Sequence, residues 1–277
     1  MSTPHLLHHH LAGAADAPPL ILGPSLGTSR AVWEPHLPSL TRRFRVLRFD
    51  LPGHGGSPTA LLRDPAPGRT TVEDLASLVL GLADHHGWDG FHYAGISLGG
   101  AIGTHLAAFH PERVASLAAV CSSAHFGAAD PWRRRAELVR REGTAPLLPN
   151  VPDRWFATAA TANTPLGRRL LGNLAEADPA GYAACCDALA AWDARSALAR
   201  ITAPTLVIGG SHDTATPSEH AEELAGGIPR AALEVIGCGH LAVEEPRALR
   251  AALTAHLSAC LAGGGTRLPR SDRAAGH

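Results

Sequence analysis

A serine flanked by glycines could act as a nucleophile in this chain. Residues 95–99 read GISLG, which matches the pattern G-x-S-x-G, and they lie between an apolar strand-like run and a helix-like run. Small residues there permit a tight strand-to-helix turn that holds the hydroxyl clear of a sheet, at a helix N-terminus. The pattern therefore predicts that Ser97 is a nucleophile. In a chain with 29 glycines the bare pattern is weak evidence, and the alternative is that Ser97 only caps the helix.

A serine hydroxyl needs a base at neutral pH, and with 17 histidines only position can select it. His240 ends a Gly-rich loop, GCGH (237–240), between the last strand-like and helix-like runs. Asp213 follows the preceding strand-like run, so the chain order is Ser, Asp, His, as expected of hydrolases built on this turn. We expect the Asp213 carboxylate to accept the Nδ1–H of His240 and to fix its tautomer. The alternatives are an ordinary loop histidine and an aspartate that only shapes a turn.

Two backbone N–H groups would have to stabilise the negative oxygen that forms during acyl transfer. The residue after the nucleophile, Leu98, supplies the first in this kind of site. Leu26, in the loop PSLGT (24–28) after an early buried strand, is the expected source of the second.

The elements that position these residues alternate between strand-like and helix-like runs. This pattern predicts a mostly parallel α/β sheet covered by helices on both faces. The expected strands are 5–11, 20–23, 45–50, 91–96, 114–121, 205–209 and 232–236. The expected helices are 31–41, 70–86, 99–110, 217–225 and 246–261, and Thr70 with Glu73 is expected to form the capping box of the second.

The alternation stops between residues 122 and 200, where helix-like segments and several prolines replace the strands. We interpret 122–200 as a helical cap inserted into a core formed by 1–121 and 201–261. The Gly-rich, polar stretch 262–277 is expected to be a disordered tail or the remnant of a linker.

Composition excludes several classes of partner. The 24 basic residues, all arginine, nearly balance 25 acidic ones, which argues against nucleic acid or an anionic membrane as the main partner. Five cysteines without a C-x-x-C pair disfavour a disulfide framework or a zinc ribbon. With no signal-peptide pattern and no long apolar run, we expect a cytoplasmic protein. The triplet His8-His9-His10 fits an early strand facing water better than a metal site.

Several longer segments resemble one hydrolase family. They are SLGT (25–28) with Trp33, FRVLRFDLPGHGGSP (44–58), GISLGG (95–100), HPERV (110–114), GYAACCDAL (181–189), PTLVIGGSHDTATP (204–217) and GHLAVEEP (239–246). Together they are similar to the 3-oxoadipate enol-lactonases, over about residues 8–261. The resemblance implies an α/β-hydrolase fold with an eight-stranded sheet and a helical cap.

The resemblance also implies a substrate: a small enol lactone that carries a carboxylate and belongs to the β-ketoadipate pathway of aromatic degradation. Ser97 would open the ring through an acyl-enzyme, with no metal or organic cofactor. A carboxylate needs a cation or strong donor, and the cap candidates are Trp132, Arg135 and Arg154. One departure is Ala242, where the family often has serine. The residues leave two alternatives open: a carboxylesterase or lactonase of secondary metabolism, and a non-catalytic receptor on the same fold. The sequence does not predict the oligomeric state.

Overall fold

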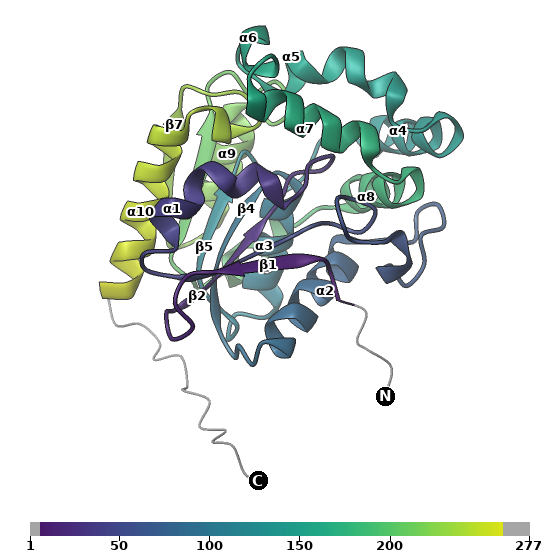
Figure 1. The fold of residues 1–277 in the computed structure, drawn as a ribbon. Coiled ribbons are helices and arrows are strands. Elements are labelled where there is room, and N and C mark those ends of the chain that lie inside the picture. Colours follow the sequence, from purple (N-terminus) through teal and green to yellow (C-terminus); the bar gives the residue numbers. More distant parts are fainter. Residues whose placement is uncertain (1–5, 263–277) are drawn as a thin grey trace.

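The computed structural model describes residues 6–262, which form a seven-stranded sheet between layers of helices (Figure 1). The strand order is β1-β3-β2-β4-β5-β6-β7, and only β1 runs antiparallel to its neighbour. The strands are β1 (His9–Ala12), β2 (Pro19–Gly23), β3 (Arg45–Phe49), β4 (Phe91–Ile96), β5 (Val114–Val120), β6 (Thr205–Gly210) and β7 (Ala231–Ile236). The mostly parallel α/β sheet is confirmed, but the described residues form seven strands where we expected eight.

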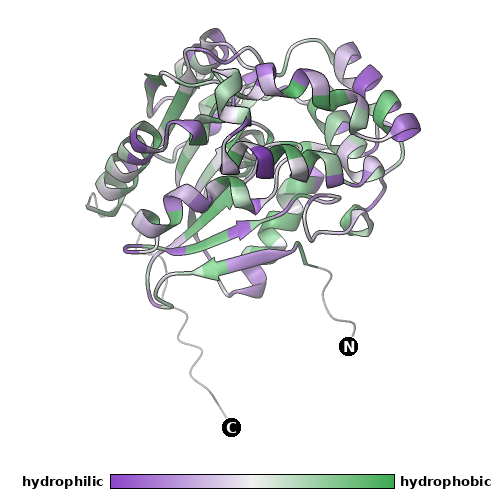
Figure 2. Cartoon of the chain, turned by 45° about the horizontal axis from the view of Figure 1, so that its top comes forward, coloured by the Kyte–Doolittle hydropathy of each residue, from purple (hydrophilic) through white to green (hydrophobic). Residues whose placement is uncertain are grey.

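The central strands are mostly apolar and buried because helices cover both faces of the sheet. All six residues of β4 are buried. In Figure 2 most of the sheet is green, with purple stretches on the strands at the front, whereas the helices carry both colours. The edge strand β1 begins at His9, later than the expected residue 5, and its first pair is His9 with Phe49 of β3.

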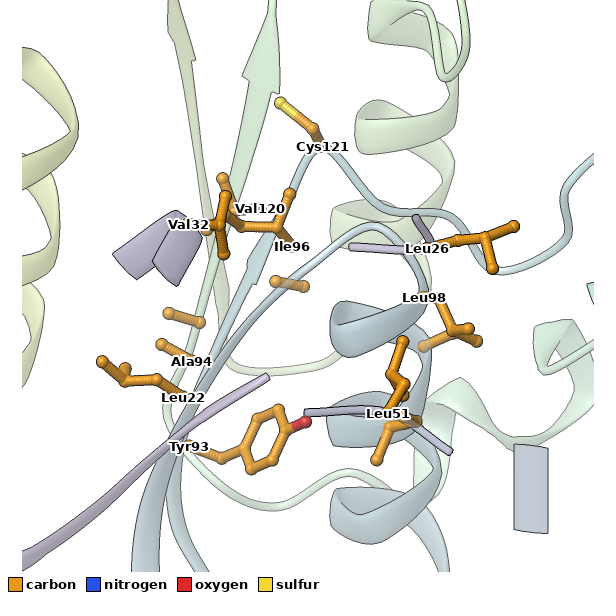
Figure 3. Packing of buried hydrophobic residues seen from close by; sticks show 14 of the residues in the cluster. Leu22, Leu26, Val32, Leu51, Tyr93, Ala94, Ile96, Leu98, Val120 and Cys121 are labelled. Atoms are coloured by element: carbon orange, nitrogen blue, oxygen red, sulfur yellow. The ribbon is translucent and has the colours of Figure 1, made fainter. Parts of the chain in front are cut away.

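Two helices, α1 (Leu37–Leu40) and α10 (Pro246–Ala262), cover one face of the sheet (Figure 1). The other face carries α2 (Val72–His85), α3 (Leu98–Phe109) and α9 (Ser218–Gly227). Since α3 packs against β2, β4 and β5, it is apolar on every side, and its residues from Leu98 to Ala108 are buried. Tyr93 and Ile96 of β4 belong to the same core, together with Leu22, Leu98 and Val120 (Figure 3).

Two local expectations were wrong. The helix expected at 31–41 is a 3-10 helix, η1 (Arg30–His36), followed by the short α1, because Pro35 and Pro38 cannot donate the hydrogen bonds of one continuous α-helix. The capping box of α2 consists of Thr71 and Asp74, one residue later than expected.

The segment between β5 and β6 contains only helices apart from one isolated antiparallel bridge between His125 and Asp193. Its helices are α4 (Ala129–Glu142), η3 (Ala145–Asn150), α5 (Val151–Trp155), α6 (Ala159–Ala162), α7 (Pro165–Glu176), α8 (Pro179–Ala191) and η4 (Arg195–Arg200). The helices α4 to α7 form the upper layer in Figure 1. We call the residues 122–200 the cap segment.

The two remaining 3-10 helices are η2 (Thr59–Leu61) and η5 (Ala242–Glu244). No helix within residues 6–262 combines the length and the apolar character that a membrane crossing requires. Of the tail expected at 262–277, only Ala262 is described, as the last residue of α10, and the rest lies outside the described residues.

Candidate active site

Ser97 lies in a strained turn between β4 and α3. Its backbone has φ 55° and ψ −117°, a combination that non-glycine residues rarely adopt and that is concentrated at functional sites. Its N–H donates to the Val120 carbonyl at 2.9 Å, which holds the turn against β5. The flanking residues must be glycines because neighbouring backbone leaves no room for a Cβ atom. A Cβ on Gly95 would lie 2.2 Å from the Gly99 carbonyl oxygen, and one on Gly99 would lie 2.5 Å from that of Gly23.

His240 and Asp213 form a buried hydrogen-bonded pair in the loops after β7 and β6. The Nδ1 of His240 lies 2.9 Å from Asp213 Oδ2. The hydroxyl of Thr216 donates to the same oxygen at 2.6 Å. The other oxygen, Oδ1, accepts the N–H groups of Ala215 at 2.7 Å and Thr216 at 2.9 Å. These bonds fix the orientation of the carboxylate. The carboxylate bonds Nδ1 of His240 and makes no bond to Nε2.

Two influences act in opposite directions on the Asp213 carboxyl. Its burial, the largest influence, raises its pKa, but the charge and hydrogen bond of His240 and the bonds from Thr216 lower it. The net effect is a lowered pKa, so Asp213 is ionised near neutral pH. An ionised carboxylate at Nδ1 favours the tautomer in which Nε2 of His240 can accept a proton.

A small cavity of about 20 Å³ brings most of the predicted residues together, but Leu98 is not part of its lining. Ser97, His240 and Leu26 line it from the sheet domain. Trp132, Arg135 and Arg154 line it from the cap segment. Asp213 lies behind His240 and does not line the cavity.

Both expected oxyanion residues are buried, Leu98 at a helix start and Leu26 in a tight turn. Leu98 is the first residue of α3, and the first N–H groups of a helix have no partner within it. Leu26 lies in a four-residue turn closed by the Thr28 N–H, which donates to the Ser25 carbonyl at 3.1 Å. The third residue of the turn, Gly27, has φ 81°, which glycine adopts without strain.

The cap side of the cavity is positively charged. Its lining contains Arg135 and Arg154 and, among the described residues, no carboxylate. Both guanidinium groups lie over the Trp132 ring, at 5.1 Å and 6.0 Å from its centroid. Burial, together with the charge of Arg135, lowers the pKa of Arg154, which indicates that its charge is poorly solvated. This arrangement favours an anionic ligand group.

Comparison with known proteins identifies the family. A family model described as the alpha/beta hydrolase fold matches residues 18–246. The chain belongs to the alpha/beta hydrolase family. A 3-oxoadipate enol-lactonase of Acinetobacter baylyi is 34% identical to this hydrolase. The match covers 90% of this hydrolase and 92% of the Acinetobacter protein.

Solved structures agree with this assignment. The enol-lactonase of Burkholderia xenovorans LB400 matches this hydrolase with a TM-score of 0.85 and 33% identity, covering 91% of this chain and 96% of the other. A thermophilic esterase of Thermogutta terrifontis matches with a TM-score of 0.83 and 28% identity, covering 92% and 93%. The resemblance to the enol-lactonases is confirmed, and hydrolase chemistry of this type follows for the chain.

Sequence reasoning missed two residues that hold the loops of this hydrolase in place. Glu244 accepts the N–H groups of Gly239 at 2.5 Å and Ala157 at 3.0 Å, so it ties the loop of His240 to the cap segment. His54 accepts the Gly27 N–H at 3.1 Å. Both residues lie in segments that resemble the lactonases, GHLAVEEP and PGHGGS, but nothing in the sequence assigned a bond to either.

A larger cavity, about 610 Å³, lies at the other end of the sheet, where Val114, Thr205 and Ala231 begin their strands. Ligands in open α/β sheets bind outside the carboxyl ends of the strands, so we assign it no role. Within residues 6–262, no three His, Cys, Asp or Glu side chains gather as a metal site would require. In the His8–His10 triplet, two side chains bond other segments of the fold: His8 bonds Asp50, and His9 bonds His86 at 2.9 Å.

Proposed function

We propose that this hydrolase is a serine lactonase that opens 3-oxoadipate enol-lactone to 3-oxoadipate. The observation that carries the proposal is a single cavity lined by a strained serine, a histidine whose other ring nitrogen is bound to aspartate, and two arginines. Among the described residues, no carboxylate joins them in that lining. The similarity to enol-lactonases from two bacteria supports the choice of substrate.

In the proposed reaction, the Ser97 hydroxyl attacks the lactone carbonyl while Nε2 of His240 takes its proton. The Asp213 carboxylate stabilises the imidazolium that forms. The ring oxygen leaves as an enolate and takes the proton held by His240, which restores the base. The resulting enol tautomerises to the ketone, so the ring does not close again readily. Water, deprotonated by His240, then attacks the acyl-enzyme and releases the acid from Ser97.

The N–H groups of Leu26 and Leu98 would stabilise the tetrahedral oxyanion in both steps. Removing one such donor typically lowers kcat by about 10² to 10³. Their location in the main chain means that substitutions of either leucine change the shape of the site rather than the donor. The apolar walls contributed by Val151 and Trp155 exclude water and so strengthen these contacts.

We assign the substrate carboxylate to Arg135 and Arg154. A hydrogen bond to a charged group contributes about 1.5–3 kcal/mol, which corresponds to roughly a 10- to 150-fold change in binding. The position of both arginines over Trp132 limits their freedom before substrate binds. A neutral ester would gain nothing from either cation.

The deciding experiment compares kcat/KM for the enol lactone with kcat/KM for p-nitrophenyl acetate. We expect a strong preference for the lactone, loss of both activities in Ser97→Ala, and loss of the preference alone in Arg154→Leu. Arg141→Leu, which removes an exposed arginine paired with Glu142, is the matched control.

The similarity to a thermophilic esterase favours a second candidate, a general carboxylesterase. High activity on the ester with none on the lactone would support that candidate and refute the lactonase proposal. Ligand binding without turnover, with no labelling of Ser97 by a fluorophosphonate, would refute both.

A further inference from the structure

His54 is a buried histidine with both ring nitrogens bonded. It follows β3 in the turn of residues 52–57, and it is 1% exposed. Its Nε2 lies 3.1 Å from the Gly27 nitrogen, and its Nδ1 lies 3.0 Å from the Pro52 carbonyl oxygen. The amide can only donate and the carbonyl can only accept, so the ring must carry its proton on Nδ1 and accept with Nε2.

The Gly27 amide belongs to the turn that presents the Leu26 N–H. A positive φ at the third residue is characteristic of a type II turn, in which the central peptide has the opposite orientation to that of a type I turn. The central peptide here joins Leu26 to Gly27. The bond to His54 holds it in one orientation, and two bonds from Thr28, from its N–H at 3.1 Å and its hydroxyl at 2.8 Å, hold the Ser25 carbonyl.

The surroundings of His54 favour its neutral form and restrict the orientation of its ring. Burial, the largest influence, lowers its pKa, against smaller raising effects from the Pro52 carbonyl, Asp50 and Asp178. The ring of Tyr182, from α8, packs against the imidazole with centroids 5.9 Å apart and planes tilted by 31°. A protonated ring, or a neutral ring with its proton on Nε2, would point an N–H at the Gly27 N–H and favour reversal of the central peptide.

We infer that His54 is a positioning residue: its Nδ1–H tautomer holds the Leu26–Gly27 peptide so that the oxyanion loop is formed before substrate arrives. The inference rests on the proposed function, because the loop matters to catalysis only if the Leu26 N–H stabilises the oxyanion. It assigns to the PGHG turn a task separate from that of His240. His54 itself touches no reacting atom.

Two substitutions separate the acceptor of His54 from its donor. His54→Gln places an amide oxygen near the position of Nε2, where it can accept the Gly27 N–H. His54→Asn reaches only the position of Nδ1, so it can donate to Pro52 but leaves the Gly27 amide without its acceptor. We expect His54→Asn to lower kcat for p-nitrophenyl acetate by about ten- to a hundredfold with little change in KM, a fraction of the loss for a missing oxyanion donor. His54→Gln should retain most of the kcat that His54→Asn loses.

The matched control is His92→Asn. His92 is also a buried histidine, 4% exposed, but it lies at the opposite end of β4 from Ser97 and bonds the Ser116 hydroxyl through Nδ1. Any loss of kcat from replacing a buried imidazole as such appears in this variant too. Equal kcat in the two His54 variants, or an equal loss in His92→Asn, would overturn the inference.

Amide hydrogen exchange tests the same point without turnover. The Gly27 amide should exchange at least about tenfold faster in His54→Asn than in His54→Gln. In the unmodified hydrolase, ¹⁵N NMR should show the His54 proton on Nδ1. This measurement needs no variant, and it tests the tautomer even if the enzyme hydrolyses no lactone. A proton on Nε2 would refute it.

Discussion

Asp213→Asn should inactivate the hydrolase while preserving its fold, and the contacts of Asp213 explain why. Oδ1 accepts two backbone N–H groups, from Ala215 and Thr216, and Oδ2 faces His240. An asparagine must place its NH₂ at one of these positions. At Oδ1 it would leave two buried N–H donors without acceptors, at about 1–3 kcal/mol each. The NH₂ therefore faces His240.

An NH₂ group at this position donates to Nδ1 and forces the proton of His240 onto Nε2. In that tautomer the imidazole cannot accept the Ser97 proton. A change of tautomer of this kind lowers kcat by about 10⁴, or about 5 kcal/mol of barrier. The main-chain bonds of the loop survive, so the variant should remain folded, with a melting temperature lowered only by loss of the stabilising Asp213 charge.

The assay is hydrolysis of p-nitrophenyl acetate, normalised to correctly folded protein by circular dichroism. Asp130→Asn is the matched control, because Asp130 is exposed and pairs only with Arg133 three residues away. We expect its kcat to equal that of the unmodified protein. A kcat within tenfold of that value for Asp213→Asn would refute the reasoning from tautomer to rate.

Three further predictions follow from other contacts. Glu244→Gln, which replaces an acceptor of the Gly239 and Ala157 N–H groups by a neutral one, should lower both kcat and the melting temperature, and unchanged values of both would contradict the tie. Gly99→Ala should destabilise the fold by several kcal/mol in urea unfolding, because its Cβ would meet backbone, and a loss below about 1 kcal/mol would be incompatible with the close approach. The pKa of Asp213 is lowered in the folded state, so its carboxylate stabilises the fold above about pH 4, and this stabilisation is lost as the pH falls through the folded pKa. Urea unfolding from about pH 6 to 3 should therefore show a smaller loss of the free energy of unfolding in Asp213→Asn than in the unmodified protein.

The sequence predicted the parallel sheet and its strands well because their patterns are dictated by burial on both faces. The strand FHYAGI, expected at 91–96, is β4 with those bounds, and every residue in it is buried. The loops after β6 and β7 bring Asp213 and His240 into contact, as their order in the chain predicted.

The wrong expectations lie where two neighbouring residues, or two sequence signals, favour different local structures. Thr70 and Thr71 both precede α2, and only the structure shows that Asp74 bonds the Thr71 N–H at 2.8 Å. The prolines at 35 and 38 outweigh the helical spacing of Trp33, Leu37 and Leu40. Sequence spacing does not encode tertiary bonds such as Gly27 to His54, which join residues 27 positions apart.

The cap segment leaves and rejoins the sheet domain at almost one point. Its two ends are joined by the bridge between His125 and Asp193 and by the Ala194 N–H, which donates to the Ala124 carbonyl at 2.8 Å. The strands on either side, β5 and β6, are direct neighbours in the sheet. Because its two ends meet at its base, the segment can change in length without parting β5 from β6. A substitution within it can therefore alter the cap side of the cavity while Ser97 stays on the other side.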